Sequence, residues 1–455
     1  MMTTNNTNNR QPGKITLIGA GLVGSLLACY LRKQGYEVDV YERRSDMRLE
    51  GGYAGRSINL ALSDRGWRGL KGVGLVDEVR KVAIPMEGRM IHNMDGTMAY
   101  QAYGKEGQAI NSVSRGGLNR LLMDEAEKAG ARIHFNMRCS HVDLESNALA
   151  FENTETGEKT TINSPLTISS DGAFSAGRLS LMFTDRCNYS QYYIEHGYKE
   201  LTIPATDAGE FRLEKNVLHI WPRGGYMLIA LPNPDGSFTC TLFFPYEGSP
   251  SFAELDSVEK VRAFFKEVFP NAYEMMPGLE YDFFHNPTGS LVTVKTYPWT
   301  FKNRLLLIGD AAHAIVPFYG QGMNCGFEDC VELDRLITEH NHDWTRIMPA
   351  YEQSRKPNGD AVADLALANF IEMRDLVGQP AFLLRKKIEA RFSERHPEKW
   401  TPLYTMVTFS ETPYSVALRE GKRQDRIMEQ VMAMPEIETI WDSDEVESLM
   451  LELLG

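Results

Sequence analysis

A glycine-rich turn near the start constrains this chain more than any other feature. Residues 14–18 are a short apolar run, Gly19-x-Gly21-x-x-Gly24 follows, and an apolar helical pattern leads to a second short run that ends in Glu42. This order is typical of a βαβ unit that binds a dinucleotide. Gly19 permits the tight turn, Gly21 lets the backbone approach a pyrophosphate, and Gly24 lets the helix lie against the strand. A turn that binds no ligand would not need the three glycines, the following helix and the final carboxylate together.

The residues after the second run bear on which dinucleotide is bound. A carboxylate at Glu42 can accept hydrogen bonds from both hydroxyls of an adenosine ribose. Arg43 and Arg44 favour a different cofactor, because arginines at this point can hold the 2′-phosphate of NADP. Glu42 would repel that phosphate, so FAD or NAD fits better, and the arginines then clamp adenosine or pyrophosphate.

Composition narrows the class of protein. The 455 residues are 43% hydrophobic and 24% charged, which is material for two or three packed units. The net charge of −13, with no basic run longer than residues 385–387, argues against a nucleic-acid partner. Six scattered cysteines and ten histidines show neither a disulfide framework nor the spacing of a metal site, so we expect no metal and a cytoplasmic protein.

The two ends of the chain lead to further expectations. Residues 1–13 are rich in Asn and Thr and lack the apolar core of a signal peptide, so we expect a disordered lead. No apolar stretch of about 18 residues occurs, so no membrane span is expected. The acidic amphipathic segment that ends at Gly455 indicates a soluble protein, and its exposed Met and Leu residues equally suit a contact in a homodimer.

The middle of the chain changes to long β-stretches. Strands are expected at 217–221, 226–231 and 238–244, and Asn233-Pro-Asp-Gly predicts a tight loop in which Asn233 pairs with Ser237. Odd-numbered residues of the last two strands then share one face: Met227, Ile229, Leu231, Thr239, Thr241 and Phe243. Such a face suits the ceiling of a pocket, but a sheet packed on helices is the commoner arrangement.

Two further strand-to-helix turns follow the glycine turn. The first is Asp171-Gly172 with Ser175 and Arg178 at fixed offsets, which suits an ordinary capped turn as well as a binding turn. The second is Gly309-Asp310, where an aspartate can accept hydrogen bonds from a polyol before a helix that begins near Met323. Together with the first βαβ unit, the second turn indicates one extended FAD that lies between Gly19 and Asn324.

These three turns, in this order, resemble the fingerprints of the single-component FAD-dependent aromatic hydroxylases, which have the para-hydroxybenzoate hydroxylase fold. Longer motifs resemble the members of this family that act on L-kynurenine: Gly55-Arg-Ser-Ile-Asn-Leu-Ala-Leu, His219-Ile-Trp-Pro, Pro317-Phe-Tyr-Gly-Gln-Gly-Met-Asn, Glu372-Met373 and Tyr404-Thr-Met-Val-Thr-Phe-Ser. The similarity covers residues 14–421. The chain departs from the family at Ala314, where a proline is usual, and this change removes no reacting group.

The resemblance implies an α/β fold with three parts. A Rossmann-like FAD-binding domain takes residues 14–85, 104–198 and 286–346, and an inserted antiparallel β-sheet domain for the substrate takes 86–103 and 199–285. A helical region, residues 347–455, is implied to close over the substrate. The helices expected there are 347–355, 361–376, 381–392 and 414–454.

The resemblance also implies site residues. The carboxylate and amine of L-kynurenine would contact Arg89, Tyr103, Asn369 and Tyr404, and arginine suits a carboxylate because its planar fork binds both oxygens. The aromatic ring would contact Met227, Leu231, Phe243, Pro317 and Phe318. FAD would contact Gly19, Gly21, Gly24, Glu42, Arg43, Arg56, Arg115, Cys139, Asp171, Asp310, Met323 and Asn324.

The implied reaction is hydroxylation of L-kynurenine to 3-hydroxy-L-kynurenine with NADPH and O₂, through a flavin C4a-hydroperoxide, in tryptophan degradation. No side chain acts as a catalyst, because the cofactor supplies the chemistry. Two other interpretations stay open at this stage. A hydroxylase for another aromatic acid would keep the three FAD turns without needing the polar set around Arg89, and a nonenzymatic flavin-binding protein would bind FAD without oxidising NADPH.

Overall fold

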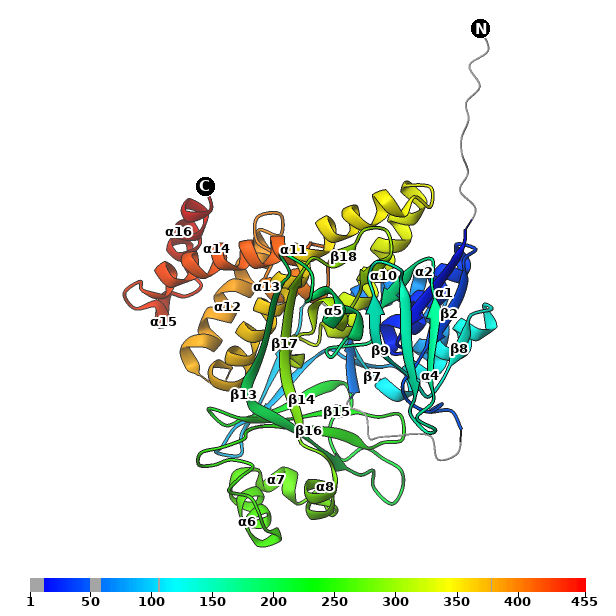
Figure 1. Cartoon of the computed structure of the whole chain (residues 1–455). Coiled ribbons are helices and arrows are strands. Elements are labelled where there is room, and N and C mark those ends of the chain that lie inside the picture. Colours follow the sequence, from blue (N-terminus) through cyan, green and yellow to red (C-terminus); the bar gives the residue numbers. More distant parts are fainter. Residues whose placement is uncertain (1–11, 50–58, 105–106, 378) are drawn as a thin grey trace.

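The computed structural model describes residues 12–49, 59–104, 107–377 and 379–455. Two large sheets and a group of C-terminal helices make up the chain (Figure 1). The predicted α/β class is confirmed. Part of the expected lead, residues 1–11, and the expected FAD contact Arg56 lie outside the described residues.

The first sheet contains the glycine-rich turn and has six strands in the order β18-β19-β12-β1-β2-β8. Its strands are parallel except for the edge strand β18. The bounds are β1 Lys14–Ile18, β2 Glu37–Tyr41, β8 Arg132–His134, β12 Thr167–Ser169, β18 Thr300–Phe301 and β19 Leu305–Leu307. Helices α1 (Leu22–Lys33) and α4 (Arg115–Lys128) pack beside this sheet, and α10 (Gly322–Glu339) packs on α1 and on α2 (Asp64–Gly72). Ser114 caps the start of α4, since its hydroxyl accepts from Gly117 N.

Smaller elements border the first sheet. A three-stranded sheet of β9 (Met137–Asp143), β10 (Ala148–Asn153) and β11 (Lys159–Asn163) follows β8, and α5 (Ala176–Leu181) packs on β9. Another small sheet joins β3 (Asn59–Leu62), β7 (Ile110–Ser114) and β4 (Ile84–Met86), and α3 (Val76–Arg80) lies between β3 and β4 in the sequence.

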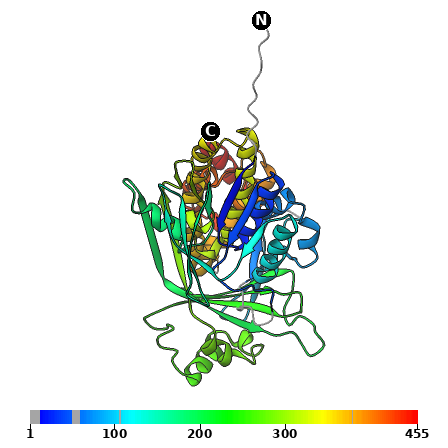
Figure 2. The same cartoon turned by 45° about the vertical axis from the view of Figure 1, so that its right-hand side comes forward.

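The second sheet has seven strands in the order β17-β13-β16-β15-β14-β5-β6. Their bounds are β5 Gly88–His92, β6 Met98–Ala102, β13 Asn188–Ile203, β14 Val217–Pro222, β15 Met227–Pro232, β16 Phe238–Pro245 and β17 Gly289–Tyr297. Strands β5 and β6, in the segment 86–103 that is expected in this domain, pair antiparallel as a hairpin. The sheet extends beyond the expected limits of 199 and 285, because β13 starts at Asn188 and β17 starts at Gly289. Figure 2 shows the molecule turned so that the strands of this sheet can be followed.

The two faces of the second sheet are both covered, by different elements. The predicted turn is confirmed: Asn233 N donates to Ser237 O at 2.8 Å, and Met227 lies opposite Phe243 in the register of β15 and β16. Even-numbered residues such as Leu242 and Phe244 pack on α6 (Val258–Val268), α7 (Pro270–Tyr273) and α8 (Leu279–His285). Odd-numbered residues instead join a core with residues of the C-terminal helices. The sheet therefore packs on helices with one face and leaves the other toward the candidate site.

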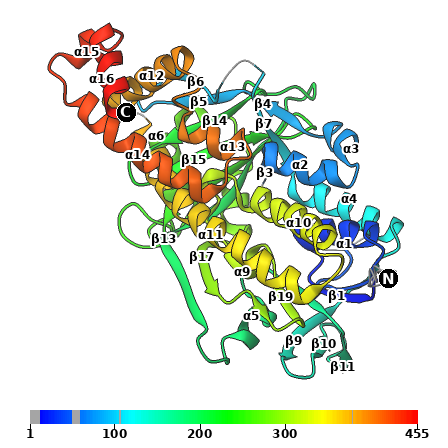
Figure 3. The same cartoon turned by 90° about the horizontal axis from the view of Figure 1, so that it is seen from above.

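The C-terminal helices begin with one long helix, α11 (Trp344–Ile371), seen from above in Figure 3. The expected break between 355 and 361 is wrong, because the helix continues through Pro357. A proline removes one helical hydrogen bond, but the buried residues Tyr351, Arg355 and Gly359 fix the helix on both sides of it. A single π-helical turn, Glu372–Leu376, follows directly.

The remaining helices pack against one another. They are α12 (Pro380–Arg395), α13 (Leu403–Thr408), α14 (Tyr414–Met432), α15 (Ile437–Ile440) and α16 (Asp444–Leu454). The expected tail helix is divided near Pro435, after which Glu436 has φ 56°. Met428 and Met450 are fully buried in a core with Trp400, so the expectation that the methionines of this tail are exposed is wrong for these two. No helix among the described residues is long and apolar enough to cross a membrane.

Candidate functional site

The three glycines of the first turn have different reasons to be glycine. Gly19 has φ 97°, and a Cβ there would lie 2.7 Å from Ser170 O; a Cβ on Gly24 would lie 2.0 Å from Gly19 O. The fold itself therefore requires these two. Gly21 has an ordinary extended conformation, and a Cβ there would meet no described atom within 4 Å. Gly21 also begins α1 without a side-chain cap, so both observations fit a phosphate group close to this backbone.

Glu42 is tied to the same turn. Its buried carboxylate accepts from Ala20 N at 2.8 Å and pairs with Arg44 Nε at 2.7 Å. Burial would raise the pKa of Glu42, but the Arg44 guanidinium outweighs burial and lowers it, so the group is a carboxylate at neutral pH. Arg43 is exposed beside it. A negative charge close to this turn disfavours a 2′-phosphate.

The second and third turns are joined to each other. Asp171 accepts from Ser169 Oγ at 3.0 Å and from Ala176 N at 2.7 Å, and Ser175 caps α5. Arg178, from α5, donates to Ala311 O at 2.8 Å, one residue after Asp310. Cys139 lies in the neighbouring strand β9, where burial raises the pKa of its thiol to about 12 and makes it unreactive at neutral pH.

The third turn begins with Gly309, which has φ 60° and donates its N–H to Asp329 Oδ2 at 3.1 Å. The next residue, Asp310, reaches solvent, and so does Arg115 at the start of α4. Asn324 uses its side chain for the backbone: Oδ1 accepts from Ser63 N at 3.0 Å and Nδ2 donates to Ala61 O at 2.8 Å. Asn324 therefore fixes β3 and α2 against the start of α10, where Met323 lies buried beside it.

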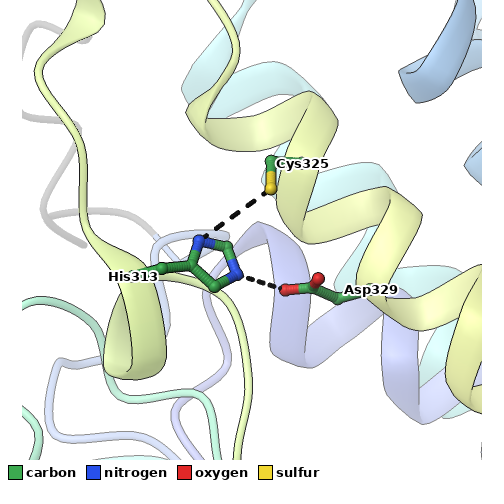
Figure 4. Close-up of side chains that lie close together, drawn as sticks. All are labelled: His313, Cys325 and Asp329. Carbon is green, nitrogen blue, oxygen red and sulfur yellow. Dashed lines mark hydrogen bonds and ion pairs between the residues drawn. The ribbon is translucent and has the colours of Figure 1, made fainter. Parts of the chain in front are cut away.

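A buried cluster lies behind this turn (Figure 4). His313 Nε2 lies 2.6 Å from Asp329 Oδ2, and Cys325 Sγ lies 3.9 Å from His313 Nδ1. Burial would lower the pKa of His313, but Asp329 outweighs it and raises that pKa well above its usual value. Arg355 Nε pairs with the other Asp329 oxygen at 2.6 Å. Because two cations already occupy Asp329, the cluster suits a histidinium–carboxylate pair rather than a metal site.

The ion pairs continue from this cluster into a buried charge network, which consists of Arg65, Glu328, Arg355, Asp329 and His313. Glu328 pairs with Arg355 Nη1 at 2.6 Å and with Arg65. The two arginines balance the two carboxylates, the protonated His313 adds one positive charge, and all five side chains are buried.

A second polar group, the Arg89 cluster, lies on the face of the second sheet that the C-terminal helices cover, and it consists of Arg89, Tyr103 and Tyr404. The Tyr103 and Tyr404 rings stack with centroids 5.2 Å apart, and the Arg89 guanidinium carbon lies 4.9 Å from the Tyr404 ring. Within the described residues, Arg89 Nε and the Tyr103 hydroxyl are buried without a hydrogen-bond partner. The nearest carboxylate paired with Arg89, that of Glu372, is 3.9 Å away. Such unsatisfied buried donors need an acceptor.

The protonation states of the Arg89 cluster suit an anionic ligand. Burial raises the pKa of Tyr103 well above its usual value and also raises that of Tyr404, so both hydroxyls can donate at neutral pH. Burial would lower the pKa of Arg89, but Tyr404, Tyr103 and Glu372 outweigh it and raise the pKa. The cluster therefore offers one cation and two hydroxyl donors.

An apolar wall adjoins this cluster. Phe243 and Phe318 have ring centroids 4.8 Å apart, and Phe318 stacks on Phe370 at 4.0 Å. Asn369 Nδ2 donates to Phe318 O at 2.7 Å. The wall and the Arg89 cluster belong to one buried core, together with Met227 and Leu231.

The structure thus brings the expected substrate residues into one core, with Asn369 and Pro317 at its border. The expected FAD residues that the structure describes lie on the turns of the first sheet, on β9 and at the starts of α4 and α10, and Arg56 is not among the described residues. Sequence reasoning missed Tyr319, which stacks on Tyr404 at 5.5 Å, and the charge network. A signal for the network was available, since Glu328 and Asp329 are adjacent acids in an apolar helical stretch.

The fold and these turns define a class, the flavoprotein monooxygenases that hydroxylate aromatic rings. The FAD binding domain family model matches residues 14–251 and 289–366, so the chain belongs to this family. The fold is also that of 2-methyl-3-hydroxypyridine-5-carboxylic acid oxygenase, with a TM-score of 0.66 and 21% identity over 82% of this chain and 96% of that one. It resembles p-nitrophenol 4-monooxygenase from Pseudomonas putida as well, with a TM-score of 0.63, 16% identity, and coverage of 91% and 99%.

Curated relatives identify the narrower family. Kynurenine 3-monooxygenase of Flavobacterium psychrophilum is 51% identical over 97% of this chain and 98% of its own length. The enzymes of that name from Myxococcus xanthus and Dictyostelium discoideum are 50% and 45% identical, each over 92% of this chain and 90% and 93% of their own lengths. The chain belongs to the kynurenine 3-monooxygenase family.

Proposed function

We propose that this protein uses FAD, NADPH and O₂ to hydroxylate L-kynurenine to 3-hydroxy-L-kynurenine, a step of tryptophan degradation. The observation that carries the proposal is the Arg89 cluster, which presents buried, unsatisfied donors in a chain that is 51% identical to a kynurenine 3-monooxygenase. L-Kynurenine has a carboxylate at one end and an aromatic amine at the other. A buried cation beside an apolar wall matches both ends of such a molecule.

The residues present fit FAD, as the open approach to Gly21 indicates. The backbone around Gly19 and Gly24 would hold the pyrophosphate, Glu42 the adenosine ribose, and Asp310 the ribityl chain. Arg43, Arg115, Cys139 and Asp171 would border the cofactor, and Met323 would lie at its ring end. Bound FAD supplies the redox chemistry, namely hydride acceptance from NADPH and activation of O₂.

The side chains of the substrate site would bind, orient and exclude water. Arg89, Tyr103 and Tyr404 would hold the carboxylate, because a guanidinium and two protonated phenols can donate to both its oxygens. The Asn369 amide nitrogen is committed to Phe318 O, so its carbonyl oxygen is the atom suited to the substrate ammonium. These contacts fix the long axis of the substrate and thus which ring carbon faces the flavin.

The apolar wall would hold the aniline ring and keep it dry. Phe243, Phe318 and Met227 are almost completely buried, and Pro317 and Leu231 complete this side of the site. Exclusion of water protects an oxygen-transferring flavin from releasing hydrogen peroxide. The wall therefore serves coupling as well as affinity.

NADPH is a transient co-substrate, because the first sheet contains one glycine-rich dinucleotide turn and that turn is assigned to FAD. The protein acts in the cytoplasm, in keeping with its six free cysteines. We also propose a homodimer in which the C-terminal helices form the contact surface. The molar mass of the protein in solution would test this.

One experiment tests the proposed function. Purified protein is expected to carry one noncovalent FAD per chain and to consume NADPH rapidly only with L-kynurenine, with a product 16 mass units heavier, the mass of one oxygen atom. Matched additions are anthranilate, which lacks the amino-acid end, and para-hydroxybenzoate. Stimulation by one of these and not by L-kynurenine would identify a different aromatic hydroxylase. FAD binding without NADPH oxidation would indicate a nonenzymatic flavoprotein.

A further inference from the structure

Helix α13 carries Tyr404 but has few means of its own to stay in place. It spans only Leu403–Thr408 and has no side-chain cap at its start. A short helix of this kind depends on tertiary contacts for its position. The position of the Tyr404 ring, and thus of a donor in the substrate site, depends on what holds this segment.

Arg65 holds it. The guanidinium comes from α2, far away in sequence, and only 2% of the residue is exposed. Its Nε donates to Val407 O at 3.1 Å, and its Nη2 donates to Met406 O at 3.4 Å and to Thr412 O. Three carbonyl oxygens at the end of α13 and just after it therefore converge on one side chain.

Arg65 is itself fixed by the charge network. Nη1 pairs with Glu328, whose second oxygen pairs with Arg355. Arg355 then pairs with Asp329 Oδ1, and Asp329 Oδ2 accepts from Gly309 N at 3.1 Å, which begins the turn of Asp310. An unbroken series of charge-assisted hydrogen bonds thus runs from the backbone of α13 to the third FAD turn.

A second connection closes the loop. The Arg65 guanidinium carbon lies 4.1 Å from the Tyr414 ring, and the Tyr414 hydroxyl donates to Gln321 Oε1 at 2.8 Å. Gln321 immediately precedes α10, the helix that carries Glu328. Arg65 therefore connects the α13 segment to α10 by two routes, through Glu328 and through Tyr414, so we expect a shift of α13 to be transmitted to α10.

We propose that Arg65 is a positioning residue that couples substrate binding at Tyr404 to the flavin turn at Gly309, through Glu328, Arg355 and Asp329. This inference rests on the proposed function, because it uses Tyr404 as a substrate contact. When a carboxylate engages Tyr404, α13 is drawn into one position, and the series of ion pairs transmits that position to the turn. The expected consequence is that substrate accelerates the reduction of bound FAD by NADPH.

The test uses Arg65→Lys in the FAD-loaded full chain. Lysine keeps the charge and can pair with Glu328, but it cannot donate to three converging carbonyls while doing so. The ratio of the flavin reduction rate with L-kynurenine to the rate without it is measured by stopped-flow absorbance. We expect this ratio to fall by about fivefold or more, the lower end of usual coupling between two sites, while FAD affinity stays near that of the parent protein.

A matched control distinguishes coupling from general stability. Arg223, directly after β14 of the second sheet, also donates to three carbonyl oxygens, those of Val268, His92 and Pro222. Arg223→Lys makes the same chemical change outside the network, so it is expected to lower the melting temperature without changing the ratio. Equal changes of the ratio in both variants would overturn the proposal.

A double variant gives the sharpest outcome. If Arg65 acts through Tyr404, the ratio in Arg65→Lys/Tyr404→Phe should equal that in Tyr404→Phe alone, since coupled residues give non-additive effects. Independent, multiplied effects would contradict the proposal, as would an unchanged ratio in Arg65→Lys. A parent protein that does not respond to L-kynurenine would instead refute the proposed function, so the two failures are distinguishable.

Discussion

The Arg89 cluster and the charge network are both buried, polar and close to the candidate site, but they differ in how far their groups are satisfied. In the network, each carboxylate has two cationic partners. In the Arg89 cluster, Arg89 Nε and the Tyr103 hydroxyl have no partner among the described residues. Buried polar groups in folded proteins are almost always paired. The network is therefore explained by the fold alone, whereas the unpaired donors of the Arg89 cluster, beside the apolar wall, are available to a ligand.

The largest effect is expected from a substitution in the charge network, where every carboxylate is paired. Arg355→Met should lower the free energy of unfolding by about 3–5 kcal/mol, because it leaves Glu328 and Asp329 buried with one partner fewer each. Urea denaturation followed by fluorescence measures it. The control is Arg335→Met on α10, an exposed arginine paired with Glu332, which should change stability by less than about 1 kcal/mol. Similar losses in both variants would mean that the network has no special energetic role.

The next largest effect is expected from a substitution in the Arg89 cluster, which has unpaired donors. Arg89→Ala should weaken L-kynurenine binding by about 2–5 kcal/mol, the usual loss when one partner of a buried charged pair is removed. The free protein should lose less stability than in Arg355→Met, because the one ion pair of Arg89 among the described residues, with Glu372, is long at 3.9 Å and its Nε has no hydrogen-bond partner there. Titration calorimetry gives the affinity, and FAD absorbance shows that the flavin site persists. If affinity equals that of Arg120→Ala, an exposed arginine on α4, then Arg89 does not contact the substrate.

The two faces of β16 offer a test at the apolar wall. Phe243→Ala should open space beside the ring, and misplacement by about 1 Å can cost on the order of a hundredfold in oxygen transfer. Hydrogen peroxide released per NADPH should rise as 3-hydroxykynurenine falls. Phe244→Ala removes an equally buried ring on the other face, so it should lower stability without raising that ratio. A Phe243→Ala enzyme that stays fully coupled would remove this residue from the site.

A smaller effect concerns pH and His313. Because Asp329 raises the folded pKa of His313, the stabilisation from this pair is fully present below about pH 6.5, the unfolded pKa, and is lost as pH rises through the folded pKa. The difference in melting temperature between the parent and His313→Gln should therefore be largest near pH 6 and shrink towards pH 10. A difference that is constant over this range would show that His313 is neutral in the fold.

The smallest effect is expected from removing one atom of the Arg89 cluster, the Tyr103 hydroxyl oxygen. Tyr103→Phe removes a hydroxyl that has no partner in the free protein, so stability should stay level or rise. Substrate affinity should still fall by about 0.5–1.5 kcal/mol, the net value of one hydrogen bond. Thermal melting and calorimetry on one preparation measure both quantities. A variant that loses stability and keeps affinity would place this hydroxyl in the fold and not in the site.

What the sequence predicted well depends on short-range patterns. The turn at residues 233–236 fixed the face of Phe243 because a hairpin register follows from its loop. The long-range features were not predictable in this way: Arg65 donates to Thr412, which is 347 positions away, and nothing local signals that contact. Pro357 is a local signal for a break, but buried contacts on both sides outweigh it. The site residues around Arg89 were predicted from the family resemblance, since composition alone does not show that an arginine is buried.

The alternation along β15 and β16 has a consequence for how this protein tolerates change. Neighbouring positions in one strand face different surroundings: Phe243 looks toward the candidate site, and Phe244 toward α6–α8. Residues 252–288, which contain those helices, lie outside the match to the family model. A substitution at an even position of β16 is therefore accommodated by α6–α8, whereas one at an odd position is accommodated by the C-terminal helices beside the candidate site. Adjacent residues of one strand thus answer to two separate packing environments.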